Sequence, residues 1–160
     1  MTEPDHAYLA KLLLYYEEEI EGEAYFDALA RRFPEPAQRK RLRLLAEVER
    51  HAAQGVAPLI AHYDLTPRSV ESLTLSGHEQ ARRAPGTWAG LLDEMNRTYP
   101  AYLAAFEALE AMGPEADQTR LRFLTEHEVA ALDYLALENA GAPQSYAPLE
   151  RYLASSPVPA

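Results

Sequence analysis

Three glutamates occupy positions where an amphipathic helix would normally place an apolar side chain. Around Glu49, the residues three, four and seven positions away in either direction are all apolar. They are Leu42, Leu45, Ala46, Ala52, Ala53 and Val56. Residues at these spacings share one face of a helix. The pattern therefore predicts that Glu49 points into a helical core.

The same pattern surrounds Glu128 and Glu23. The neighbours of Glu128 on its helix face are Leu121, Leu124, Thr125, Ala131, Leu132 and Leu135. Those of Glu23 are Leu12, Tyr16, Ile20, Phe26 and Ala30, and Glu19 lies one turn earlier on the same face. The sequence thus predicts three helices that each point a carboxylate inward near mid-length.

Inward carboxylates need compensation, because burying even one unpaired charge costs several kcal/mol. A divalent cation is one solution. Since the chain contains no cysteine, its ligands would be oxygen and imidazole, which suit iron, manganese or zinc. The other solution is protonation or hydrogen bonding to tyrosines on or beside the apolar faces, namely Tyr16, Tyr99, Tyr102 and Tyr134.

His127 is the histidine best placed to add to such a site. Apolar residues and Tyr134 flank it, which predicts a half-buried position at the edge of a helix face. Successive helical residues diverge by about 100°. His127 is therefore not expected to share one ion with Glu128 without distortion, and a hydrogen-bonded packing role is the alternative.

Four long segments with helical periodicity must position these residues. We expect helices from about Asp5 to Arg32, Pro36 to Tyr63, Thr87 to Met112 and Ala116 to Asn139, with a kink or break at Pro100. Proline and glycine mark the segments between them. A short helix is expected around Arg68 to Leu75, and another within Ser145 to Leu153.

The lengths of the connections predict the topology. The first and third are short and imply antiparallel neighbours, whereas residues 64–86 are long enough to cross the length of a bundle. The fold class is therefore all-α: a four-helix bundle with one long crossover, the ferritin-like arrangement. We expect residues 1–154 to form a single domain and residues 155–160 a flexible tail.

Composition excludes several function classes. The formal net charge of −10 argues against a nucleic-acid partner, since such binding depends on clustered Lys and Arg. No apolar run is long enough to span a membrane, and the polar N-terminus does not resemble a signal peptide, so we expect a cytoplasmic protein. No phosphate-binding loop or nucleophile elbow is present.

Three short segments resemble the ligand-bearing helices of ferritin-like and rubrerythrin-like proteins: residues 21–26, 46–52 and 126–131. By this resemblance, Glu23 matches the ligand of the first helix, and Glu49 and Glu128 match the acidic ligands of the second and fourth. Those families place histidine three residues after the last two glutamates, where this chain has Ala52 and Ala131. The usual two-histidine, four-carboxylate set is therefore incomplete.

Two hypotheses follow. In the first, an iron or manganese ion is held by an incomplete ligand set: Glu23, Glu49 and Glu128, with Glu19 and His127 as additions. The resemblance then implies redox or oxygen chemistry. In the second, the chain is a metal-free relative with hydrogen-bonded core glutamates and an interaction role. The sequence leaves open whether the protein is an enzyme; the resemblance also implies a homodimer.

Overall fold

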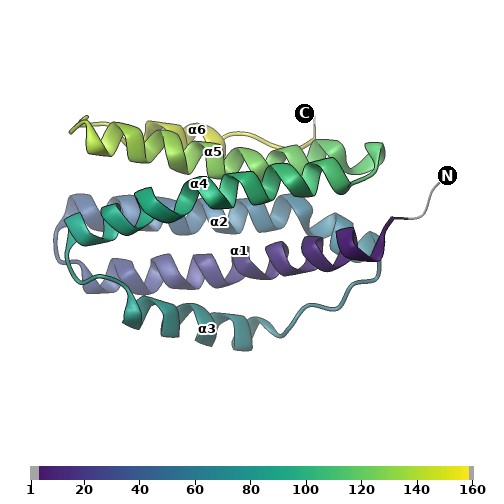
Figure 1. Ribbon diagram of the computed structural model, residues 1–160. Coiled ribbons are helices and arrows are strands. Elements are labelled where there is room, and N and C mark those ends of the chain that lie inside the picture. Colours follow the sequence, from purple (N-terminus) through teal and green to yellow (C-terminus); the bar gives the residue numbers. More distant parts are fainter. Residues whose placement is uncertain (1–3, 159–160) are drawn as a thin grey trace.

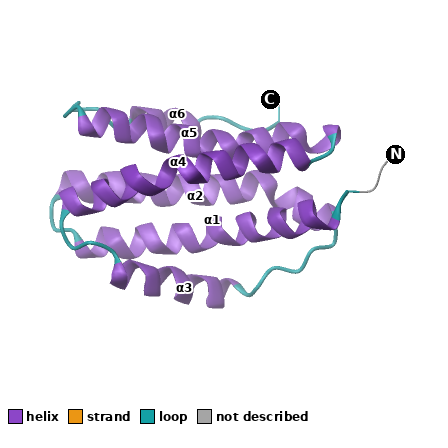
Figure 2. Ribbon diagram, in the orientation of Figure 1, coloured by secondary structure: helices purple, strands orange, loops and turns teal. Residues whose placement is uncertain are grey.

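The structure, a computed structural model, describes residues 4–158, and every regular element in that range is a helix (Figures 1 and 2). The four long helices are α1 (His6–Arg32), α2 (Pro36–His62), α4 (Trp88–Met112) and α5 (Gln118–Asn139). The shorter ones are α3 (Val70–Arg83), the 3-10 helix η1 (Glu115–Asp117) and α6 (Ala147–Leu153). The predicted all-α class is confirmed.

Local sequence explains the ends of the long helices, which lie within two residues of the predicted ones. The Asp5 side chain accepts a hydrogen bond from the amide of Ala7, and that of Thr87 accepts one from Gly90. These caps satisfy amides that have no partner inside the helix. No break occurs at Pro100, because α4 continues through it.

The helix between the two hairpins is longer than predicted. Instead of a short helix around Arg68 to Leu75, α3 has 14 residues and packs along α1 (Figure 1). Its close approach depends on Gly77, where an added Cβ would lie 2.3 Å from the backbone oxygen of Glu21. Buried Leu73, Gly77 and Ala81 recur every fourth residue, which is the spacing of one helix face.

Contacts at the two ends of the molecule fix the directions of the long helices. At one end, Tyr8 of α1 and Tyr63, just after α2, both donate hydrogen bonds of 2.7 Å to buried Asp117. The start of α1, the end of α2 and the start of α5 therefore meet there. Gly113, which directly follows α4, lies against the ring of Tyr8, so the end of α4 is at this end of the molecule as well.

At the opposite end, the ring of Phe33, just after α1, packs edge-on against Trp88 at the start of α4. Glu138, near the end of α5, pairs with Arg41 of α2 at 2.9 Å and accepts a hydrogen bond from Trp88. Thus α1 and α2 are antiparallel, as are α4 and α5. Because α2 and α4 run in the same direction, residues 63–87 cross the length of the molecule, as predicted (Figure 1).

Of the predicted tail, residues 155–158 are described, and the carbonyl oxygen of Ser155 lies 2.7 Å from Nε2 of His51. Residues 159–160, like residues 1–3, lie outside the described residues. No helix within residues 4–158 combines the length and the apolar character needed to cross a membrane.

Candidate metal centre

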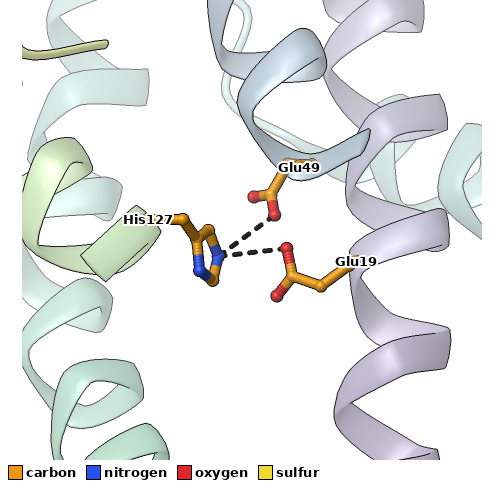
Figure 3. A group of neighbouring side chains, drawn as sticks. All are labelled: Glu19, Glu49 and His127. Atoms are coloured by element: carbon orange, nitrogen blue, oxygen red, sulfur yellow. Dashed lines mark ion pairs between the residues drawn. The ribbon is translucent and has the colours of Figure 1, made fainter. Parts of the chain in front are cut away.

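Glu19 of α1, Glu49 of α2 and His127 of α5 converge in the interior (Figure 3). The Nε2 atom of His127 lies 3.0 Å from Oε2 of Glu19 and 3.3 Å from Oε2 of Glu49. Oε2 of Glu128 is farther away, at 3.7 Å from the same nitrogen. Two of the three converging side chains are almost fully enclosed, since Glu19 is 3% exposed and His127 2%.

Heptad-spaced apolar neighbours hold the two glutamates in place. Glu19 lies seven residues after Leu12 and seven before Phe26, and both of these are buried. Glu49 has the same relation to buried Leu42 and Val56. Residues seven apart lie almost directly above one another on a helix, so packing of these apolar residues directs each carboxylate inward.

Gly22 makes room for Glu49. A Cβ built on Gly22 would lie 3.0 Å from the carboxylate carbon of Glu49 and 3.2 Å from its Oε1. Any larger residue at position 22 would therefore displace the Glu49 carboxylate. A glycine inside a helix costs roughly 0.5–1 kcal/mol relative to alanine, and here the missing side chain opens the site.

The orientation of His127 leaves Nε2 available. Its Nδ1 contacts the carbonyl oxygen of Leu124, one turn earlier on α5. A carbonyl only accepts hydrogen bonds, so Nδ1 carries a proton and donates it. In the neutral ring, Nε2 then keeps a free lone pair that faces Glu19 and Glu49. The ring of Phe106 packs edge-on against the imidazole, with centroids 5.0 Å apart.

Two buried carboxylate oxygens accept no hydrogen bond. They are Oε2 of Glu19, despite its closeness to Nε2 of His127, and Oε1 of Glu128. Buried acceptors are normally satisfied, and leaving one unsatisfied costs about 1–3 kcal/mol. A cation bound at the centre of this acidic cluster would give these oxygens the partner that they lack.

The cluster perturbs its own ionisation. Burial, then the nearby charge of Glu49, raise the pKa of Glu19 well above its usual value, although His127 opposes this. Burial also acts to raise the pKa of Glu49, but the Glu19 carboxyl group and His127 lower it overall. Burial acts to lower the pKa of His127, yet Glu19 and Glu49 raise it well above its ordinary value.

Glu128 has a pKa of about 7, raised mainly by burial and further by Glu49, while His127 opposes the change. Without a cation, the four groups therefore share protons: Glu19 and Glu128 resist ionisation, whereas Glu49 ionises and the imidazole retains its charge. Bringing so many ionisable groups together in the interior is typical of functional sites, although structural ion-pair networks do the same.

Glu23 does not join this group. Its side chain is partly exposed and pairs with Arg50 of α2 at 4.0 Å, so α1 contributes Glu19 in the place that the resemblance gave to Glu23. The heptad from Leu12 through Glu19 to Phe26 indicated Glu19, but Tyr16 and Ala30 surround Glu23 at the same spacing, so the sequence did not decide between the two. His127 was expected to be half-buried at the edge of a helix face, but it is almost fully buried. Its Nε2 faces the glutamates of α1 and α2 and lies farther from its neighbour Glu128.

A cavity of about 510 Å³ adjoins the three side chains. Residues of α1 form one wall and residues of α4 the other, and Gln80 and Arg83 of α3 lie near them. The cavity exists because α1 approaches α4 over only a short stretch, whereas α1 packs extensively on α2 and α3. Glu19, Glu49, His127 and Glu128 all line it, and Glu49, whose side chain is 17% exposed, is the most accessible of the four.

Comparison with known proteins found no matching family model, no matching curated protein and no matching solved structure.

Proposed function

We propose that Glu19, Glu49 and His127 bind one divalent iron or manganese ion, and that this ion performs redox chemistry on a molecule in the adjoining cavity. The observation that carries the proposal is the convergence of two carboxylate oxygens and one imidazole nitrogen within 4.8 Å of one another, in the interior. Oxygen and imidazole donors suit these ions, whereas softer ions prefer the thiolates that this chain lacks.

The spacing of the donors supports the proposal. Two ligands at right angles, each about 2.1 Å from an ion, are themselves about 3 Å apart. The distances of 3.0 Å and 3.3 Å from Nε2 to the two glutamate oxygens have this size. The hydrogen bond from Nδ1 to a backbone carbonyl is also the outer contact that metal-binding histidines usually make.

Glu128 is the natural fourth donor, because its Oε2 lies at the edge of the group, 3.7 Å from Nε2 of His127. Three or four protein ligands leave positions on the ion open toward the cavity. An ion held in this way polarises a molecule bound beside it, and iron or manganese can also change oxidation state.

The helix arrangement supports a ferritin-like layout for this site, with four long helices in two antiparallel hairpins joined by one long crossover. Such bundles build metal sites from inward glutamates on facing helices. Here the Glu-x-x-His pairs that complete a two-metal set are absent, since Ala52 and Ala131 occupy those positions. We therefore propose a single ion.

The alternative is a metal-free bundle in which charged His127 forms an ion pair with the two glutamates. The raised pKa of His127, which burial alone would lower and which Glu19 and Glu49 elevate, favours this alternative. In that case the cluster would be a structural element, and the bundle would act through its surface.

The metal-binding proposal and the metal-free alternative are distinguished by titrating the metal-free protein with manganese or iron(II). Isothermal calorimetry and thermal melting follow the titration. The wild type should bind one ion, and Glu19→Gln should lose most of the binding. A ligand at a hundredfold excess over its Kd stabilises the folded state by about 2.7 kcal/mol, which raises the melting midpoint by several degrees.

Glu23→Gln is the matched control, because it makes the same change one helical turn away, outside the cluster. It should keep the wild-type affinity. If the wild type neither binds nor is stabilised by either ion, the metal proposal fails and the ion-paired bundle remains. If Glu23→Gln abolishes binding while Glu19→Gln preserves it, the assignment of ligands is wrong.

A further inference from the structure

We propose that the cavity beside the Glu19–Glu49–His127 cluster binds a small organic cation, a primary alkylamine in its simplest form. This inference rests on the proposed function, since it names the class of molecule presented to the ion. The volume of about 510 Å³ lies within the range of roughly 300–1,000 Å³ typical of small-molecule sites. The chemistry of the lining then decides which molecules fit.

The lining carries an excess of negative charge. Besides the cluster and Glu128, it contains Glu18, Glu21 and Glu94. Only Glu21 is well compensated, through Arg68, Ser76 and Gln80. Arg83 also lines the cavity, but its guanidinium pairs with Glu79. Within residues 4–158, the carboxylates of Glu18 and Glu94 take part in no salt bridge or hydrogen bond.

A bound divalent ion would not neutralise this excess. Its two charges offset only part of the three carboxylates nearest to it, and Glu18 and Glu94 stay uncompensated. Burial, followed by the charges of Glu21, Glu49 and Glu17, raises the pKa of Glu18, which reflects the crowding of carboxylates along this side of α1. A cationic ligand would relieve the repulsion, whereas an anion would add to it.

A second, independent feature points to a ligand inside the cavity. Oε1 of Glu128 faces no hydrogen-bond donor although the residue is only 5% exposed. A primary ammonium group carries three N–H donors and no acceptor. It can therefore supply the donor that Glu128 lacks and still reach a second carboxylate.

Aromatic and apolar side chains suit the rest of such a molecule. Tyr99 and Tyr102 of α4 pack edge to face with centroids 5.9 Å apart, and Tyr25 of α1 also lines the cavity. Aromatic faces attract cations by about 0.5–2 kcal/mol. Met95 and Phe106 add apolar surface for an alkyl chain. Carboxylates interspersed with tyrosines favour an ammonium group on an apolar body over a neutral or anionic compound.

The test compares three probes of equal chain length on the manganese-loaded protein: n-pentylamine, 1-pentanol and pentanoate. Calorimetry should detect binding of the amine, binding of the alcohol at least about tenfold weaker, and no binding of the carboxylate. Glu94→Gln should weaken amine binding by about tenfold and leave manganese affinity within about twofold. Glu107→Gln, on an exposed part of α4 outside the cavity, should change neither.

Equal binding of pentanol and pentylamine, or an unchanged amine affinity in Glu94→Gln, would overturn the inference. So would a second manganese ion that binds in place of the amine, because the acidic lining would then serve inorganic cations only. Repeating the amine titration on metal-free protein separates this inference from the proposed function. If manganese binds and the amine does not, the ligand class alone is wrong; if the amine binds and manganese does not, the metal centre is wrong.

Discussion

At the scale of single residues, Gly22 controls the position of Glu49. Alanine at position 22 would place a methyl group 3.0 Å from the Glu49 carboxylate carbon, which lies at the far end of a flexible side chain and can shift. In metal-free protein we expect Gly22→Ala to be neutral or to stabilise the fold by up to about 1 kcal/mol through helix propensity. Manganese affinity should nevertheless fall at least about tenfold.

Calorimetric titration checks the affinity, and urea unfolding in chelator checks the stability. A loss of affinity accompanied by a large loss of stability would mean that the substitution disrupts the fold instead of moving one ligand.

In the absence of metal, replacing Glu19 and replacing His127 should have different effects on the free energy of unfolding. Glu19 has a raised pKa, mainly because of burial, so Glu19→Gln replaces a carboxyl group that resists ionisation with a neutral amide whose oxygen can still accept a hydrogen bond from Nε2 of His127. We expect the free energy of unfolding to change by less than about 1 kcal/mol or to increase. His127→Gln instead removes the cation between two carboxylates and should cost about 1–3 kcal/mol.

Urea denaturation of both variants at neutral pH in chelator gives the comparison. If Glu19→Gln proves much the more destabilising of the two, the ionised carboxylate of Glu19 is the main partner of charged His127, and the expected order of stabilities is wrong.

At the scale of elements, α3 forms one side of the molecule through a close contact with α1. Leu73 of α3 is fully buried, and Gly77 of the same helix abuts the backbone of α1. Two residues before α3, the amide of Arg68 donates a 2.7 Å hydrogen bond to buried Glu17, and its guanidinium pairs with Glu21. The crossover is therefore a packed layer, and it holds the α1 wall of the cavity in place.

Gly77→Ala tests this packing. The added Cβ would clash with a backbone oxygen of α1, which cannot rotate away as a side chain can. We expect a loss of about 1–3 kcal/mol, as for other overpacked positions. Leu75→Ala, on the exposed side of the same helix, should stay within about 0.5 kcal/mol. Thermal or urea unfolding measures both; equal stability of the two variants would show that α3 is not closely packed in solution.

At the scale of the whole molecule, a bound ion would join the two hairpins. Glu19 and Glu49 belong to the α1–α2 hairpin and His127 to the α4–α5 hairpin (Figure 3). The helices α1 and α4 themselves touch little. Metal binding should therefore slow amide hydrogen exchange in the middle of α1, α2 and α5 together. The distant N-terminal turn of α3 should be unaffected.

Hydrogen exchange with and without manganese measures this effect, with Glu19→Gln as the control that should show no change. Protection confined to α1 and α2 would mean that His127 is not a ligand.

The sequence by itself determined the helices and their connections. Helix periodicity, capping residues such as Asp5 and Thr87, and the positions of proline and glycine are local properties, so the long helices and the crossover follow from them. The apolar surroundings of Glu49 and Glu128 likewise identified two carboxylates that line the cavity. Each of these features depends on residues within a turn or two of one another.

Only the tertiary structure decided which side chains meet. α1 is covered by α2 on one side and α3 on another, so its buried surface is wide and includes Glu17 as well as Glu19. Periodicity alone could not distinguish Glu19 from Glu23, because both have apolar residues seven positions away on either side, although only Glu19 is buried. The meeting of His127 with Glu19 and Glu49 depends on how α5 packs against the α1–α2 hairpin. The size of the cavity depends on the distance between α1 and α4. Both are set by packing of residues far apart in the chain. Such distances leave no mark on the local pattern of any one helix.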